Sequence, residues 1–215
     1  LNEDRLRDCL PQLARGIIAL HQRGIVHRDL KPGNVMVTNQ GKVVILDFGL
    51  VAELQQNLDA SQTRSAMFVG TIPYAPPEQM FGKRTEANDW YGFGTIIYEA
   101  LTGTLPFPGN KQENLLRKQQ EEPPTLTGQD DTPSDLAGLV DGLLCRDASD
   151  RIGADAVAKF FELDDDTRSM RVHTWEPELR LYSSIVLQAG VLLAFVVVMW
   201  NMWQRQSERR VARQP

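Results

Sequence analysis

The most informative part of this sequence reads His27-Arg28-Asp29-Leu30-Lys31-Pro32-Gly33-Asn34, and Asp47-Phe48-Gly49 follows it. Asp29 and Asn34 are close enough in the chain for one loop to present both side chains to the same cleft. Apolar residues on either side of Asn39-Gln40-Gly41 predict a tight hairpin over 35–38 and 42–46, and its far strand would bring Asp47 to that cleft. Taken singly, these polar residues would suit a turn, a loop cap and a strand exit. Together, in this order, they indicate one shared site.

A helix is predicted before this 27–34 loop, over residues 4–22. Its apolar residues recur at helical spacing on one face, at Leu6, Leu10, Leu13, Ile17 and Leu20. Pro11 lacks a backbone N–H and is awkward inside a helix, so we expect the regular helix to start near it.

Beyond the hairpin, the irregular polar stretch 55–65 is long enough to be a functional or disordered loop. Asn88 and Asp89 can cap a helix over 90–101 that stops at Gly103. That helix is apolar nearly all round, which predicts that it is buried. Shorter amphipathic helices are expected near 112–120, 134–145 and 154–161.

The composition is that of a globular protein with room for one sizeable domain and an appendage: 215 residues, 42% hydrophobic and 24% charged. A net charge of −5 argues against a nucleic-acid-binding surface. Cys9 and Cys145 stand far apart with no C-x-x-C pattern, which is typical of reduced, structural thiols.

These motifs resemble those of protein kinases. The 27–34 loop fits the signature H-R-D-L-x-x-x-N, and residues 47–49 fit D-F-G. Residues 70–78 resemble the substrate-docking segment that ends in Ala-Pro-Glu, with Pro76 at the alanine position, and residues 89–107 resemble the central buried helix and its exit. The resemblance covers about residues 4–161 and looks closest to bacterial Ser/Thr kinases of the eukaryotic-like type, which often carry Lys-Pro-Gly-Asn in this loop.

The fold that this resemblance implies is mainly α: the C-lobe of a protein kinase over residues 1–163, with a small β-hairpin that carries the catalytic and metal-binding loops. An acidic linker over 164–182, one transmembrane helix over 183–203 and a basic tail over 204–215 complete the expected organisation.

The resemblance also implies the residues of the active site. Asp29 would be the catalytic base that orients the substrate hydroxyl, Lys31 would reach the transferred phosphoryl group, and Thr71 would hydrogen-bond toward both. Asn34 and Asp47 would hold Mg²⁺, or Mn²⁺ in its place, against the phosphates of ATP. Met36 would form the apolar floor beneath adenine. Lys31 and Thr71 are the choices of kinases that phosphorylate Ser and Thr in proteins.

Further residues would support this site. His27 and Phe48, beside Gly49, would stack in an internal spine, Asp89 would tether the 27–34 loop, and Glu78 would form a buried ion pair with Arg151. Arg28 would bind a phosphorylated activation segment, whose candidate phosphosites are Ser61, Thr63 and Ser65, with Thr63 as the first choice. His21 is interpreted as a packing residue.

The ATP-binding half of a kinase has no counterpart in the sequence. Residues 1–26 contain only Gly16 and Gly24 and no G-x-G-x-x-G. We therefore interpret the chain as a truncated and by itself inactive piece of a Ser/Thr protein kinase. Two alternatives stay open: a non-catalytic pseudokinase or scaffold lobe tethered to a membrane, and a small-molecule kinase of the aminoglycoside type. The second kind lacks a segment like 70–78.

The predicted membrane span rests on the run 181–204, which contains no charged residue and exceeds the roughly 20 residues that cross a bilayer. Tyr182 lies at one end and Trp200 and Trp203 at the other, as interfacial aromatic residues do. A buried helix of a soluble domain is the alternative. A kinase lobe needs ATP, which predicts a single-pass protein with a cytoplasmic lobe, although the arginines after 204 favour the opposite orientation.

Overall fold

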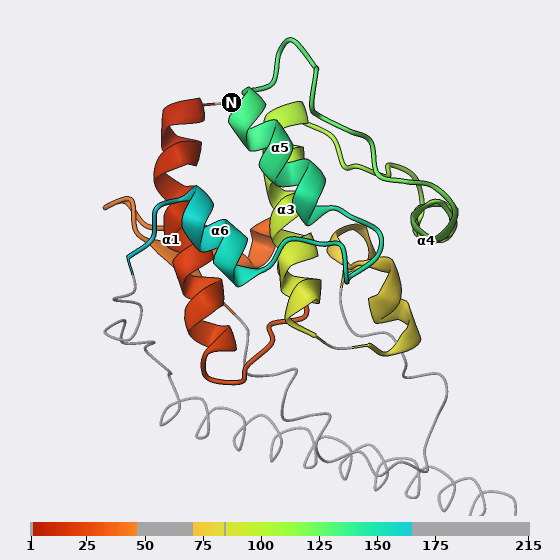
Figure 1. Ribbon diagram of the computed structural model, residues 1–215, viewed down its shortest axis with the longest axis horizontal. Helices are drawn as coiled ribbons and strands as arrows, with labels where there is room; N and C mark the ends of the chain where they lie inside the picture. Colours follow the sequence, from red (N-terminus) through yellow and green to blue (C-terminus); the bar gives the residue numbers. More distant parts are fainter. Residues whose placement is uncertain (1, 47–70, 84, 165–215) are drawn as a thin grey trace, which may run out of the picture. The chain divides into compact units, whose positions relative to one another are not determined.

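The computed structural model describes residues 2–46, 71–83 and 85–164. The chain divides into two compact units, Leu1–Val172 and His173–Pro215, and all described residues belong to the first. The described residues are mainly helical and include a two-stranded sheet (Figure 1). The predicted fold class is therefore confirmed as far as the helical lobe is concerned.

Helix α1 spans Glu3–His21 and begins well before Pro11, so the predicted start was wrong. The Asn2 side chain accepts a hydrogen bond from the Arg5 backbone N–H at 3.0 Å and caps the first turn. Leu10 and Leu13 of this helix lie buried in the core. The cap and this packing favour a continuous helix in spite of the backbone donor that the proline lacks.

The hairpin consists of β1, Val35–Val37, and β2, Val43–Ile45, in antiparallel register with Met36 opposite Val44. It forms where the sequence predicted it, and Gly41 takes a left-handed φ of 76° in its turn. β2 lies against α1, where a Cβ on Gly16 would come within 2.8 Å of the Ile45 side chain. Glycine at this position therefore lets the hairpin approach the helix closely.

Helix α3, Glu86–Thr102, is the centre of the lobe (Figure 1). Trp90, Phe93 and Ile97 are at most 1% exposed, so the predicted burial is confirmed. The helix starts before the predicted residue 90, because Thr85 is its N-cap and donates its backbone N–H to the Asn88 side chain at 2.8 Å. Its predicted stop is also confirmed, since Gly103 ends it with a φ of 73°.

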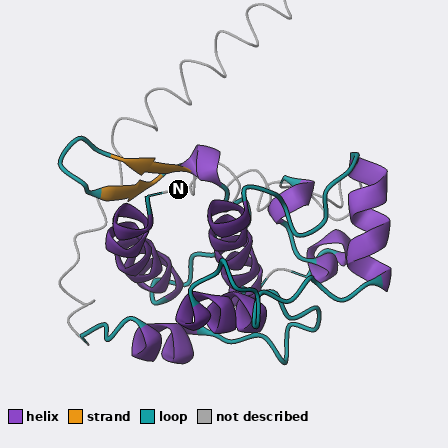
Figure 2. Ribbon diagram, turned by 90° about the horizontal axis from the view of Figure 1, so that it is seen from above, coloured by secondary structure: helices purple, strands orange, loops and turns teal. Residues whose placement is uncertain are grey.

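Three further helices lie in the described part of the lobe. They are α4, Lys111–Gln120, α5, Ser134–Leu143, and α6, Ala154–Phe160, all within two residues of the predicted ranges. Short 3-10 turns lie at Pro32–Asn34 (η1), Ile72–Tyr74 (η3) and Pro77–Phe81 (η4). Helix α5 packs against α3, α6 against α1 and α4 against η3. Figure 2 shows the hairpin on the α1 side of the lobe, whereas α4 and the turns η3 and η4 lie on the other side of α3.

Among the described residues, no helix is both long and apolar enough to cross a membrane. The predicted span at 183–203, most of the linker before it and the basic tail after it lie outside the described residues.

Candidate active site

The backbone of the 27–34 loop is fixed by one buried carboxylate. Asp89, 1% exposed near the start of α3, accepts the His27 N–H on Oδ2 at 2.8 Å and the Arg28 N–H on Oδ1 at 2.7 Å. Arg28 adopts a left-handed φ of 70°, which is unfavourable for a non-glycine residue and needs such support. Asp89 therefore makes the tether that the resemblance implied.

His21 extends this tether, which the sequence analysis missed. Its Nε2 lies 2.8 Å from Oδ2 of Asp89, and its ring meets Trp90 edge-on at a centroid distance of 5.5 Å. The histidine packs in the core as expected, but it also links the end of α1 to the loop. No local signal could have found this contact, because Asp89 is 68 residues away in sequence.

The Asp29 carboxylate is held by Lys31 and Thr71, which also contact each other. Oδ2 accepts a hydrogen bond from Lys31 Nζ at 2.6 Å, and Oδ1 accepts the Thr71 backbone N–H at 2.8 Å. Lys31 Nζ also donates to the Thr71 hydroxyl at 2.7 Å. Burial by itself would raise the pKa of Asp29, but the hydrogen bonds from Lys31 and Thr71 outweigh it and hold the pKa below its usual value. The carboxyl group is therefore ionised at neutral pH.

Asn34 contacts the same carboxylate through its amide nitrogen. Nδ2 donates to the Asp29 backbone oxygen at 2.8 Å and to Oδ2 at 3.2 Å. This orientation uses the donor end of the amide and leaves Oδ1 as its acceptor end. An amide oxygen beside a carboxylate suits a hard divalent cation.

The end of β2 is joined to the loop directly ahead of Asp47. The Leu46 N–H donates to the Asn34 backbone oxygen at 2.8 Å, and the Leu46 oxygen lies 2.8 Å from His27 Nε2. His27 is thus buried against this strand end. Asp47, Phe48, Gly49 and the candidate phosphosites Ser61, Thr63 and Ser65 lie outside the described residues, and their roles stay predictions.

Met36 lies on the exposed face of the hairpin, and the residue is 46% exposed. Its cross-strand partner Val44 is 36% exposed on the same face. The role of Met36 as a floor for adenine stays a prediction.

The 70–78 segment is anchored at its end by the predicted ion pair. Arg151 Nη1 donates to Oε1 of Glu78 at 2.6 Å, with the arginine side chain 0% and the glutamate 12% exposed. The same guanidinium donates to the backbone oxygens of Ala87 and Cys145 at 2.8 and 2.9 Å. Arg151 therefore joins the segment to the start of α3 and the end of α5.

The sequence matches the protein kinase domain family over residues 1–160. This chain belongs to the protein kinase family. It is 34% identical over 156 residues to the Ser/Thr-protein kinase AtPK1/AtPK6 of Arabidopsis thaliana, covering 71% of this chain and 31% of that protein. It is 36% identical over 157 residues to the Ser/Thr-protein kinase PknA of Mycobacterium tuberculosis, covering 70% of this chain and 36% of PknA. The chain thus spans about a third of the length of these relatives.

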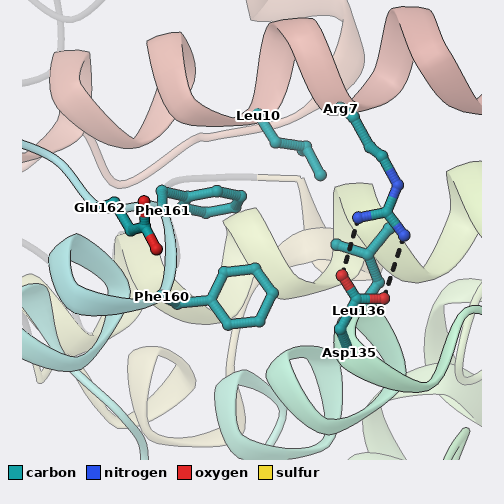
Figure 3. A pocket seen from close by; sticks show the side chains of 7 residues that line it. All are labelled: Arg7, Leu10, Asp135, Leu136, Phe160, Phe161 and Glu162. Carbon is teal, nitrogen blue, oxygen red and sulfur yellow. Dashed lines mark hydrogen bonds and ion pairs between the residues drawn. The ribbon is translucent and has the colours of Figure 1, made fainter.

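A cavity lies apart from the cluster around Asp29 and shares no lining residue with it. That cavity has a volume of about 380 Å³ and lies among α1, α5 and α6. Figure 3 shows the paired side chains of Arg7 and Asp135 at one side of it and the rings of Phe160 and Phe161 at the other. None of the kinase motif residues lines it.

Proposed function

We propose that this chain is the catalytic half of a Ser/Thr protein kinase that transfers the γ-phosphoryl group of ATP to protein hydroxyls. The observation that carries this proposal is the geometry of the Asp29 carboxyl group, which accepts hydrogen bonds from Lys31 Nζ at 2.6 Å and from the Thr71 N–H at 2.8 Å. A carboxylate fixed in this way can accept a hydrogen bond from a substrate Ser or Thr hydroxyl and orient its oxygen for attack.

Lys31 and Thr71 define the surroundings of that hydroxyl. The Lys31 ammonium already touches the carboxylate and lies where it can neutralise charge on a phosphoryl group beside it. Lys31 Nζ also donates to the Thr71 hydroxyl at 2.7 Å, and this contact joins the expected substrate-docking segment to the 27–34 loop. A substrate hydroxyl that enters between these groups would meet one acceptor and one cation.

The amide oxygen of Asn34 is a ligand type that suits a divalent cation. The Asn34 amide oxygen and Asp47 would hold Mg²⁺, which supplies positive charge to the phosphates when it is bound. The turn η1 directs the Asn34 nitrogen toward Asp29, so the oxygen is the end of the amide that can coordinate.

Phosphoryl transfer would also need an ATP-binding N-lobe, which residues 1–26 do not encode. The exposed pair Met36 and Val44 would form the half of the adenine pocket that this chain provides. We expect residues 1–215 alone to bind ATP weakly and to transfer no phosphate. The uncharged run 181–204 would tether the kinase to a membrane with its lobe in the cytoplasm, where ATP is available.

Replacement of Asp29 tests the proposal, in a protein that joins an ATP-binding N-lobe to this chain. Asp29→Ala should lower kcat for a generic Ser/Thr protein substrate by about 10²–10⁴-fold, because hydroxyl positioning is lost. ATP affinity, measured by calorimetry, should change little. Asp130→Ala removes an exposed carboxylate and serves as the matched control. If the unmutated protein binds ATP but transfers no phosphate, the chain is a pseudokinase lobe and the proposal fails.

A further inference from the structure

A buried lysine outside the kinase motifs contacts the backbone of the 70–78 segment. Lys118 lies on α4 and is 1% exposed. Its Nζ donates to the backbone oxygens of Ile72, Pro73 and Ala75 at 2.8, 2.7 and 2.8 Å. All three donors of the ammonium are thus directed at one stretch of chain.

The surroundings of this lysine make it costly to bury. No carboxylate lies within 4.0 Å of Nζ in the described ranges, and the nearest aromatic ring is that of Tyr91, with its centroid at 5.2 Å. The guanidinium of Arg151 lies 5.0 Å from the same ring and is paired with Glu78 on η4. On α4 itself, Arg117 pairs with Glu121 at the surface.

Because no anion compensates the charge, burial lowers the pKa of Lys118 to about 7. An apolar side chain of similar length would fill the same space without this cost. It would, however, leave three backbone oxygens without the donor that now satisfies them. The lysine is therefore explained by what it does to the segment rather than by what it adds to the core.

The segment that it holds is connected to the reacting groups. Ile72 directly follows Thr71, whose N–H and hydroxyl contact Asp29 and Lys31. Further along, the Tyr74 hydroxyl donates to Glu99 of α3 at 2.7 Å, so residues 72–75 are held between α3 and α4. A displacement of this stretch would move Thr71 away from the carboxylate.

We propose that Lys118 is a positioning residue that fixes residues 71–78 through three backbone oxygens, so that peptide substrates meet a preformed surface next to Asp29. This role rests on the proposed kinase function. The contact itself does not, and the two can be tested separately.

Hydrogen–deuterium exchange on residues 1–215 tests the contact without any need for activity. In Lys118→Met, the backbone N–H groups of residues 71–83 should exchange at least tenfold faster, whereas α1 and α5 keep their rates. Lys118→Arg retains a cation that can donate to the same oxygens and should stay within about threefold of the unmutated rate. Lys111→Met removes an exposed lysine from the same helix and is the matched control.

Two results of this experiment would overturn the proposal. Unchanged exchange in residues 71–83 would show that the lysine does not hold the segment. Equal acceleration in α1, α5 and the segment would show that it supports the whole lobe instead of one surface.

Kinetics on a protein with an N-lobe test the consequence for substrate binding. Lys118→Met should raise KM for a peptide substrate about tenfold and leave KM for ATP within twofold, a difference that general destabilisation would not produce. An equal rise in both constants would argue against positioning. Absence of transfer by the unmutated protein would refute the kinase function, while the exchange result would still decide on the contact.

Discussion

At the scale of single residues, Lys118 should make stability depend on pH. Its pKa falls from 10.5 to about 7 in the folded lobe, whereas the unfolded chain keeps the ordinary value. Between these values the unfolded state binds one more proton, so the folded state gains stability as pH rises. Relative to Lys118→Met, we expect the free energy of unfolding to rise between about pH 7 and 9 with a slope approaching about 1.4 kcal/mol per pH unit. Urea denaturation at several pH values measures this slope, and parallel curves for the two proteins would contradict the prediction.

Arg151 is the second residue whose replacement should have a large effect. Arg151→Leu strands the Glu78 carboxylate and the three backbone oxygens, of Ala87, Cys145 and Arg146, that the guanidinium now satisfies. Removal of one partner from a buried pair costs about 3–5 kcal/mol, and chemical denaturation should show a loss of that size. Arg146→Leu breaks the pair with Glu122, whose side chains are 38% and 67% exposed, and should cost at most about 1 kcal/mol. Similar losses in the two variants would mean that burial of the Glu78 pair does not matter.

At the scale of secondary-structure elements, the contact between α3 and the end of α5 depends on a glycine. A Cβ at Gly94 would come within 2.7 Å of the Leu143 Cβ, so Gly94→Ala must push the two helices apart. Overpacking of this kind costs about 1–3 kcal/mol, against roughly 1 kcal/mol of helix propensity gained. We therefore expect a lower melting temperature.

Gly138 on α5 provides the control for this prediction, because nothing lies within 4 Å of the Cβ that Gly138→Ala would add. That variant should gain about 0.5–1 kcal/mol through reduced backbone entropy of the unfolded chain. If both alanine variants shift the melting temperature in the same direction, the close approach of the helices is not what sets the effect at position 94.

At the scale of the whole molecule, the proposed membrane tether can be separated from the lobe. The full chain should stay in the membrane fraction after carbonate extraction, because about 20 apolar residues suffice to span the hydrocarbon. A chain that ends at Val172, the boundary of the first compact unit, should be released by the same treatment. A second control, Leu193→Arg with Val197→Arg, places two charges in the centre of the run at about 2.5–3.5 kcal/mol each and should weaken retention. Release of the unmutated chain by carbonate would rule the span out.

Several features of the lobe could be predicted from the sequence because they depend on short-range patterns. The apolar residues on either side of Asn39-Gln40-Gly41 were enough to predict the hairpin, because its two strands are neighbours in the chain. The nearly uninterrupted apolar character of residues 90–101 was enough to predict that α3 is buried, because a helix without a polar face exposes apolar side chains to water wherever it is not covered. The signature of the 27–34 loop is likewise local, and it was enough to predict the kinase family, which the family match over residues 1–160 confirms.

What the tertiary structure decided are contacts between residues far apart in the chain. His21 meets Asp89 across 68 residues and Lys118 meets Ile72 across 46, and neither residue lies in a motif that announces its partner. The start of α1 before Pro11 also depends on the tertiary structure. The Asn2 cap and the burial of Leu10 outweigh the tendency of proline to interrupt a helix. Packing brings such groups together and removes the water between them, so an ordinary lysine or histidine acquires a specific role that no local pattern encodes.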